Sequence, residues 1–338
     1  MTAALRVLFG RERFAAGLAW QDLAPLLPGW EIVVSPPDRV ADHVGGVDAV
    51  CSFGAWIDAA VLAAGSFGIV HQYGVGLERV DVARATELGV WVCRVPGDVG
   101  GNADSVAELA MLHLLALVRR LSAMKAVIAG RQWESRPAGG SLLGATVLIV
   151  GLGAIGTAVA LRLVPFGTRL LGVRASPQLG GVPGMELVAG PGQLPELLGR
   201  ADAVICCAML DSSTAGMFGT KEFAAMKRGA LFVNVARGGL VDEAALLAAL
   251  ESGQVGGAGL DVHATEPADP DSALLRHPSV IATPHVGGLT GMMFRRTGEM
   301  FAANLQRWAD GEPPRWAANQ PAFSRWPGTS AAPAASAI

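Results

Sequence analysis

Short apolar runs alternate with longer mixed segments along the first part of the chain. The runs LRVLF, EIVV, VDAVCSF, FGIVHQ and VWVCRV are separated by segments such as RFAAGLAWQDLAPLL and WIDAAVLAA, in which apolar and polar positions are mixed. Strand-length runs that alternate with helix-length segments are typical of βαβ units and of a mostly parallel sheet. The pattern therefore predicts one α/β unit over this part of the chain.

A second alternation begins at TVLIV and continues through TRLLGV, DAVICCAM, ALFVNVA, AGLDV and SVIATPH, with helical segments such as DEAALLAALESG between the runs. It predicts a second parallel sheet. Residues 102–130 and residues 289–311 have the apolar periodicity of long helices, and EPPRWAANQP after the latter predicts an extended return.

The length of 338 residues favours two domains, because a single hydrophobic core rarely grows this large. We expect residues 99–287 to form one domain and residues 1–98 together with 288–325 to form the other. Residues 326–338 are small, polar or broken by proline, so we expect a disordered tail there.

Composition and charge exclude several kinds of partner. Hydrophobic residues make up 51% of the chain, but no run reaches the roughly 18 residues of a membrane span. The start MTAALRVLFGRERF becomes charged too early for a secretory signal, so we expect a cytoplasmic protein. The net charge of −3 without a basic cluster offers nothing to nucleic acid or an anionic membrane, and the cysteines lack metal-site spacing. We therefore expect a small-molecule ligand and no metal.

A glycine-rich turn follows the predicted strand TVLIV and opens a predicted helix. Its pattern is Gly151-x-Gly153-x-x-Gly156, in the context in which this motif binds dinucleotides. The helix then begins at Ala154 and Ile155, and the N–H groups at its N-terminus favour binding of the dinucleotide's pyrophosphate. A glycine turn without a ligand is the alternative.

The residue expected to recognise the ribose departs from the usual fingerprint. An acidic residue would follow the next strand, but TRLLGV is followed by Arg174. A guanidinium can bind a 2′-phosphate through two hydrogen bonds, so Arg174 favours NADP over NAD as the cofactor. A solvated loop arginine is the alternative.

Three further strands deliver charged or titratable residues just past their apolar runs. These are Arg237, then Asp261 and Glu266, and then His285. Ligands of open α/β sheets bind beyond the carboxyl ends of the strands, so these side chains could face one crevice. An arginine can clamp a carboxylate, and a histidine with a carboxylate partner can donate a proton. Singly, each residue could instead be a loop cap, a surface acid or a structural histidine.

The segment NVARGGLVDEAALLAALESGQVGGAGLDVHATEP and the later TPHVGG resemble the D-isomer-specific 2-hydroxyacid dehydrogenases. The resemblance extends from about residue 45 to residue 320 through QYGVGLERVD, GNADSVAELA and GEPPRWAANQ. It implies an α/β fold of two Rossmann-like domains with parallel sheets and the active site in the interdomain cleft. It also implies that residues 99–287 are the dinucleotide-binding domain, that the other is the substrate domain, and that the cofactor domain forms a homodimer.

The resemblance also assigns roles to individual residues. Arg237 would hold the substrate carboxylate and polarise the keto oxygen, His285 would donate a proton to that oxygen, and Glu266 would hydrogen-bond the imidazole and fix its orientation. Asp261 would hold the nicotinamide carboxamide, and we expect Gly287 to belong to the cofactor site.

The expected substrate contacts lie in the other domain. The backbone at Val75 and Gly76 would supply N–H donors to the substrate carboxylate. Ser52, Phe53 and Gly54 would line the pocket for the substrate side chain.

Several positions depart from the family pattern, and they leave cofactor choice and substrate side chain open. Arg174 replaces the usual acid, His263 stands where an aromatic residue is common, Arg94 stands where asparagine is common, and Asp211 lies beside the cofactor strand. His263 is the one residue that could rival His285 as the acid, and the resemblance favours His285. The other histidines, expected to be structural, are His43, His71, His113 and His277.

Together these observations predict a reductase that transfers hydride from NADPH, or from NADH as the second choice, to glyoxylate, hydroxypyruvate or a larger 2-keto acid. One alternative is a nucleotide-sensing module, like the transcriptional co-repressors among this family's relatives. Another is a formate or phosphite dehydrogenase of the same fold, which Glu266 disfavours because the formate enzymes use a different partner for the histidine.

Overall fold

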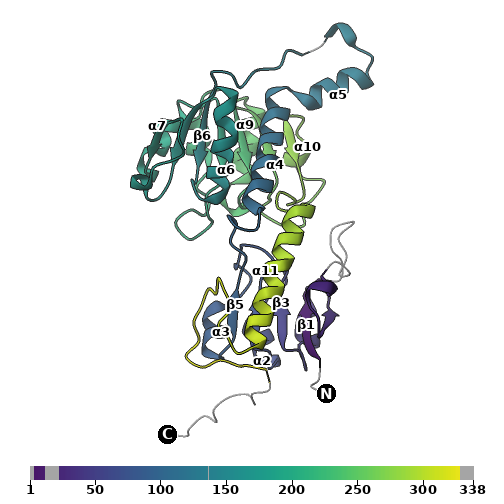
Figure 1. The fold of residues 1–338 in the computed structure, drawn as a ribbon. Helices are drawn as coiled ribbons and strands as arrows, with labels where there is room; N and C mark the ends of the chain where they lie inside the picture. The colour runs from purple at the N-terminus through teal and green to yellow at the C-terminus, as the bar shows by residue number, and fades with distance from the viewer. Residues whose placement is uncertain (1–3, 12–22, 136, 328–338) are drawn as a thin grey trace. The chain divides into compact units, whose positions relative to one another are not determined.

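The computed structural model describes residues 4–11, 23–135 and 137–327, and all but the first two residues of the expected tail 326–338 lie outside these ranges. The chain divides into two compact units, which are described separately (Figure 1). Unit 1 consists of the chain up to Gly101 together with the chain from Leu289 on, and unit 2 runs from Asn102 to Gly288.

The sheet of unit 2 is parallel and doubly wound. Its strands are β6 (Thr146–Val150), β7 (Arg169–Val173), β8 (Met185–Ala189), β9 (Ala203–Cys206), β10 (Ala230–Asn234), β11 (Val255–Leu260) and β12 (Val280–Ala282). They lie in the order β12-β11-β10-β9-β6-β7-β8, so the chain moves outward from β6 in one direction, returns to β9, and continues in the other. Such a reversal between β6 and β9 leaves a crevice for ligands beyond the carboxyl ends of the strands.

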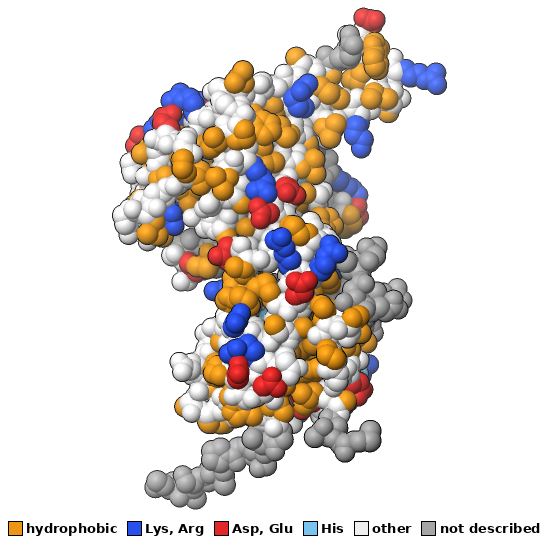
Figure 2. All heavy atoms as spheres, in the orientation of Figure 1, with side chains coloured by type: hydrophobic (Ala, Val, Ile, Leu, Met, Phe, Trp, Pro, Cys, Tyr) orange, Lys and Arg blue, Asp and Glu red, His pale blue; other side chains and the backbone are white. Residues whose placement is uncertain are grey.

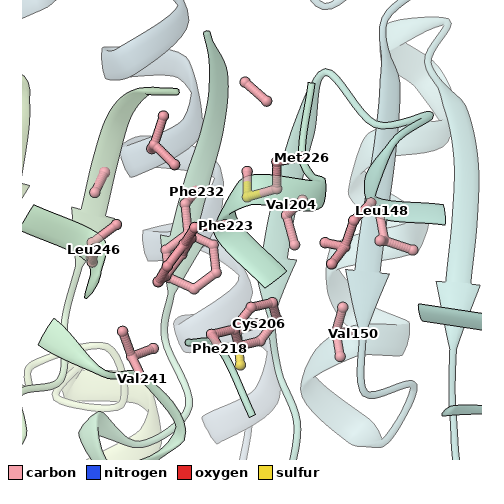
Figure 3. Close-up of a cluster of buried hydrophobic side chains, with 14 of the residues drawn as sticks. Leu148, Val150, Val204, Cys206, Phe218, Phe223, Met226, Phe232, Val241 and Leu246 are labelled. Carbon is pink, nitrogen blue, oxygen red and sulfur yellow. The ribbon is translucent and has the colours of Figure 1, made fainter. Parts of the chain in front are cut away.

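Side chains on both faces of this sheet are buried, as its continuous apolar runs require. On β6, Val147 and Ile149 join one hydrophobic cluster while Leu148 and Val150 join the other. Figure 3 shows the second cluster, in which Phe232 of β10 lies edge-on to two other phenylalanines at ring-centroid distances of 4.9 and 5.3 Å.

Helices cover both faces of this sheet. One cluster includes side chains of α4 (Asn102–Val118) and α6 (Ala154–Leu163), and the other includes those of four shorter helices. The shorter helices are α7 (Leu194–Leu198), α8 (Thr220–Ala225), α9 (Glu243–Glu251) and α10 (Ala273–Arg276). Short 3-10 turns are η3 (Trp133–Ser135), η4 (Val164–Phe166), η5 (Pro177–Leu179), η6 (Pro191–Gln193) and η7 (Gly238–Leu240).

The prediction of one continuous helix over residues 102–130 is wrong. α4 ends at Val118, and a separate helix α5 (Leu121–Ala129) begins after Arg120, which has a left-handed backbone with φ 53°. A residue in this conformation cannot continue a right-handed helix. The apolar periodicity persists across the break without glycine or proline, so the sequence gives no signal for it.

Unit 1 also contains a parallel sheet, with strands β1 (Leu5–Phe9), β2 (Trp30–Val34), β3 (Ala49–Cys51), β4 (Ile69–His71) and β5 (Trp91–Cys93). The strands lie in the order β2-β1-β3-β4-β5. Its helices are η2 (Ala24–Leu26), α1 (Val40–His43), α2 (Ala59–Ala64), α3 (Val82–Glu87) and α11 (Gly291–Ala309). Two parallel sheets covered by helices confirm the predicted fold class.

The C-terminal part of the chain completes unit 1. The predicted helix over residues 289–311 is confirmed as α11, and its Phe301, Leu305 and Trp308 lie in one hydrophobic cluster with apolar residues of the sheet. The return after α11 reaches β5, where Ala318 N donates to Val92 O at 2.7 Å. Residues from both ends of the sequence therefore share one core.

The described residues contain neither a candidate membrane span nor a candidate metal site. Within the described ranges, no helix is long and apolar enough to cross a membrane. The same residues contain no group of three histidine, cysteine or acidic side chains placed to hold a metal ion.

Candidate active site and cofactor turn

The three glycines after β6 meet different steric demands. A Cβ at Gly151, which has φ +98°, would lie 2.5 Å from Ala208 N, and a Cβ at Gly156 would lie 1.9 Å from Gly151 O. Both positions are closed to any side chain by backbone that cannot move away. At Gly153, in contrast, a Cβ would meet no atom of the described residues within 4 Å. Packing within the protein therefore explains why Gly151 and Gly156 are glycines, but it does not explain why Gly153 is one.

The space beside Gly153 is bounded by the start of α6. Gly153 is the N-cap and provides no side-chain acceptor, while Ala154 follows as the first helical residue and is exposed. The first N–H groups of a helix have no acceptor within the helix, and they carry the positive end of its dipole. The turn therefore fits the pyrophosphate of a dinucleotide, with the backbone of Gly153, Ala154 and Ile155 nearest to it.

Arg174 lies directly after β7, the neighbour of β6. Its backbone N–H donates to Ala189 O at the end of β8 at 3.0 Å, and its Nη1 donates to Gly180 O in the following loop at 2.8 Å. The side chain is half-buried. This bond uses one of the five N–H donors of the guanidinium.

Arg237 lies in the loop after β10, whose shape depends on a buried asparagine. Asn234 accepts a hydrogen bond from Ala236 N and donates one to Arg237 O, both at 3.0 Å. The next residue, Gly238, cannot carry a side chain, because its Cβ would lie 1.9 Å from His263 O. The loops after β10 and β11 are therefore packed against each other, which brings Arg237 near the residues of the β11 loop.

Glu266 and His285 form a direct pair. His285 Nδ1 lies 2.8 Å from Glu266 Oε2, and His263 N donates to Glu266 Oε1 at 3.2 Å. Partial burial opposes ionisation of Glu266, but the hydrogen bond and charge of His285, together with that of His263 N, outweigh it and lower the pKa of the carboxyl. The carboxylate orients the ring through Nδ1, and the imidazole is 45% exposed. The other ring nitrogen, Nε2, is thereby available for proton transfer.

Asp261 holds the loop that carries His285. Its carboxylate is 2% exposed and accepts three hydrogen bonds, from Thr283 Oγ1 at 2.6 Å, Val286 N at 2.9 Å and Gly287 N at 2.8 Å. Its carbonyl oxygen accepts a fourth from His285 N at 2.7 Å. Gly287 has to be glycine, because a Cβ there would lie 2.9 Å from Asp261 Oδ2.

His263 and His285 differ clearly in their surroundings. The His263 ring is buried, and its Nε2 hydrogen-bonds Thr283 O at 3.0 Å. The Glu266 carboxylate accepts a hydrogen bond from the backbone N–H of His263, whereas it contacts the imidazole ring of His285. The geometry therefore gives a carboxylate-oriented, exposed imidazole only at His285.

The residues expected to contact substrate in unit 1 are linked by a side chain that the sequence did not single out. Ser52 is fully buried and donates to Gln72 Oε1 at 3.1 Å, while Gln72 Nε2 donates to Gly76 O at 3.0 Å. Gln72 thus joins the loop after β3 to the loop that contains Val75 and Gly76. The Ser52 hydroxyl supports the loop from inside.

The loop after β3 has a strained backbone held by an arginine. Phe53 has φ 42° and Gly54 has φ 97°, both in the left-handed region. Arg79 Nη1 donates to Gly54 O at 2.5 Å, and its guanidinium lies over the ring of exposed Trp56 at 5.7 Å. These contacts give the backbone at Phe53 and Gly54 a defined conformation.

One of the departures from the family pattern, Asp211, has a local explanation. Asp211 Oδ1 accepts from Ser213 N at 2.8 Å and Ser213 Oγ at 2.6 Å, and these bonds lower the pKa of this exposed carboxyl. Asp211 therefore shapes its own turn. Arg94 is exposed just after β5, and its backbone N–H faces Trp316 O at 3.5 Å.

Comparisons with known proteins place this geometry in a family. Residues 111–287 match the family model described as D-isomer specific 2-hydroxyacid dehydrogenase, NAD binding domain. A glyoxylate reductase from Korarchaeum cryptofilum is 35% identical over 91% of this chain and 91% of its own length. The chain belongs to the D-isomer specific 2-hydroxyacid dehydrogenase family, as its sequence motifs suggest.

Two further similarities show the range of the family around this chain. A D-3-phosphoglycerate dehydrogenase from Mycobacterium bovis is 40% identical over 76% of this chain, which spans about half of that relative, 48% of its length. A crystal structure of an NADPH-dependent glyoxylate/hydroxypyruvate reductase from Sinorhizobium meliloti, in complex with NADP and malonate, matches with a TM-score of 0.79 at 28% identity. That match covers 95% of this chain and 98% of the other.

The glycine turn provides a matched pair of substitutions. We expect Gly156→Ala to destabilise unit 2 strongly, because its Cβ would clash with Gly151 O. Gly153→Ala should leave the melting temperature within about 2 °C, since its Cβ enters open space. Gly153→Ala should nevertheless weaken binding of a nicotinamide dinucleotide by about tenfold or more. Thermal unfolding and fluorescence titration measure the two effects, and equal cofactor affinity in Gly153→Ala and the parent protein would contradict this account of the turn.

Proposed function

We propose that this protein is a reductase that converts 2-keto acids to D-2-hydroxy acids with a nicotinamide cofactor, and that it prefers NADPH. The observation that carries the proposal is the 2.8 Å pair of His285 Nδ1 and Glu266, which lies beyond the carboxyl ends of the same sheet whose strand β6 leads into the dinucleotide turn. Unit 2 is then the dinucleotide-binding domain, and unit 1 is the substrate domain.

The residues of this chain have complementary tasks in such a reaction. Arg237 binds the substrate carboxylate and draws electron density from the keto oxygen. When bound, the reduced nicotinamide supplies a hydride to the keto carbon. His285, held through Nδ1 by Glu266, gives the proton on Nε2 to the oxygen as its charge develops, which completes the hydroxyl group. The backbone N–H groups at Val75 and Gly76 hold the carboxylate from the substrate domain.

Two observations support NADPH over NADH. Arg174 follows β7 where an acid would repel a 2′-phosphate, and the strand end that carries it lies beside the turn, because Gly151 N donates to Val173 O at 2.8 Å. The similar Sinorhizobium meliloti enzyme is named NADPH-dependent and was crystallised with NADP. The same enzyme and the Korarchaeum relative support glyoxylate and hydroxypyruvate as the first substrates to test.

Paired initial rates with NADPH and NADH test the proposal over a panel of 2-keto acids. We expect turnover with a higher kcat/KM for NADPH. Arg174→Ala should raise the KM for NADPH about tenfold and leave that for NADH unchanged, because only NADPH carries the 2′-phosphate. Arg169→Ala, which removes an exposed arginine paired with Glu186, is the matched control. An NADH preference would refute the cofactor proposal, and cofactor binding without turnover on any 2-keto acid would favour a sensing module.

We also propose that the protein is a homodimer formed through unit 2. Helix α5 has no buried residue, and Figure 1 shows it extending away from the sheet of its unit. Ile128 is 66% exposed and Trp133 is 61% exposed, and Figure 2 shows apolar side chains along this projecting segment. An isolated helix of this length is marginal in water without tertiary contacts, so a second copy of unit 2 is the natural cover.

A charge placed on this helix tests the dimer. We expect Ile128→Asp to shift the protein from dimer to monomer, because a carboxylate would be buried at the interface. Leu179→Asp, which alters an equally exposed leucine elsewhere on unit 2, should leave the mass unchanged. Light scattering coupled to gel filtration gives both masses, and a dimeric Ile128→Asp or a monomeric parent protein would refute this role of α5.

A further inference from the structure

A second histidine lies behind the catalytic loop and has no role in the proposed reaction. His113 lies on α4 and is 1% exposed. Its Nε2 is 3.2 Å from Thr283 Oγ1, and Thr283 Oγ1 donates to Asp261 Oδ1 at 2.6 Å. The His113 imidazole is thus the first member of a hydrogen-bond chain that runs through Thr283 to the Asp261 carboxylate, and this carboxylate holds the loop of His285.

The hydrogen-bond chain has one consistent direction. The Thr283 hydroxyl has a single proton, and the short bond to Asp261 uses it. The contact with His113 must then receive its proton from the imidazole, so His113 carries a proton on Nε2. His113 Nδ1 finds no hydrogen-bond partner among the described residues, which fits a ring nitrogen without a proton.

Burial keeps this imidazole neutral. Desolvation lowers the pKa of His113 below the ordinary histidine value, although the charge of Asp261 and the backbone of Gly259 act in the opposite direction. A cationic imidazole here would be a charge in a buried and largely apolar setting, which is unfavourable.

The neighbouring strand makes room for this ring. A Cβ at Gly259 on β11 would lie 2.7 Å from the His113 Cβ and 3.1 Å from its Nδ1. The absence of a side chain at Gly259 therefore allows α4 to bring the imidazole up to Thr283. The position is otherwise apolar, with Ala110, Leu114 and Leu117 of the same helix in the surrounding cluster.

The loop needs such support because its backbone is strained at His285. This residue has φ 53°, in the left-handed region that is unfavourable for a non-glycine residue. Strain of this kind persists only where the surroundings fix the conformation. All three polar groups of Thr283 are held: the hydroxyl contacts His113, the carbonyl contacts His263, and the N–H donates to Leu260 O.

We propose that His113 is a positioning residue for the reaction: as a neutral Nε2–H donor to Thr283, it fixes the hydroxyl on Asp261 and thereby sets the place of the His285 imidazole. His113 does not contact the reacting atoms. The inference rests on the proposed function for its kinetic consequence, and its structural part stands on the hydrogen bonds alone.

The kinetic test compares two substitutions with different donors. His113→Leu removes the N–H, and we expect kcat to fall about tenfold with little change in the KM for either substrate, because a small displacement of a catalytic group costs rate. His113→Gln returns an N–H donor near the position of Nε2 and should recover most of the loss. His277→Leu makes the same change at the end of α10 and should leave kcat unchanged.

Two further measurements separate positioning from a general loss of stability. His113→Leu removes an unsatisfied buried acceptor from an apolar cluster, so its melting temperature should be equal to or above that of the parent protein. Thr283→Val cuts the chain at its next member, and the double variant His113→Leu/Thr283→Val should be no slower than Thr283→Val alone. A wild-type kcat in His113→Leu, a loss in proportion to its melting temperature, or additive losses in the double variant would overturn the proposal.

Nuclear magnetic resonance of the protein labelled with 15N-histidine tests the structural part without turnover. We expect His113, assigned with His113→Gln, to be the neutral Nε2–H tautomer at neutral pH, and the ring signals of His285 to shift in His113→Leu but not in His277→Leu. An Nδ1–H or cationic His113, or an unshifted His285, would overturn the proposal. If the parent protein reduces no 2-keto acid, the proposed function fails and these spectra still decide the positioning role.

Discussion

The buried carboxylate of Asp261 is the interaction on which the candidate site depends. It accepts hydrogen bonds from Thr283, Val286 and Gly287, and the carbonyl of the same residue accepts from His285 N. Hydrogen bonds to a charged acceptor are stronger than neutral ones, so this cluster can offset the strained backbone of His285. The loop that carries His285 after β12 is therefore held in place beside Glu266 by Asp261 at the end of β11.

Close backbone packing is the second constraint, and glycine makes it possible. Gly151 and Gly156 bring β6, β9 and α6 together around the turn, and Gly238 brings the loop after β10 against His263 O. These contacts leave no room for a Cβ, so the backbone segments approach each other more closely than any other residue would allow. Gly153 alone is open, and its exposure beside the first N–H groups of α6 is what a bound pyrophosphate requires.

Much of this arrangement could be predicted from the sequence, because short apolar runs and helical periodicity indicate which segments are strands and helices. The two parallel sheets, α11 and the polar residues after β10, β11 and β12 follow from those patterns. The patterns do not show which side chains contact each other in the folded protein. The break at Arg120, the link through Gln72 and the contact of His113 with Thr283 depend on tertiary packing, and a histidine on an apolar helix face is indistinguishable from a structural one until its neighbour is known.

We propose that His285, oriented by Glu266, supplies the proton in keto-acid reduction. His285→Asn tests it most directly, because asparagine tolerates the left-handed backbone at this position and removes the imidazole. The measurement is kcat for the best 2-keto acid at saturating cofactor, together with the Kd of the cofactor. We expect kcat of His285→Asn to fall about 10²- to 10⁴-fold, while the Kd of the cofactor stays unchanged. A variant that keeps near wild-type kcat would contradict it.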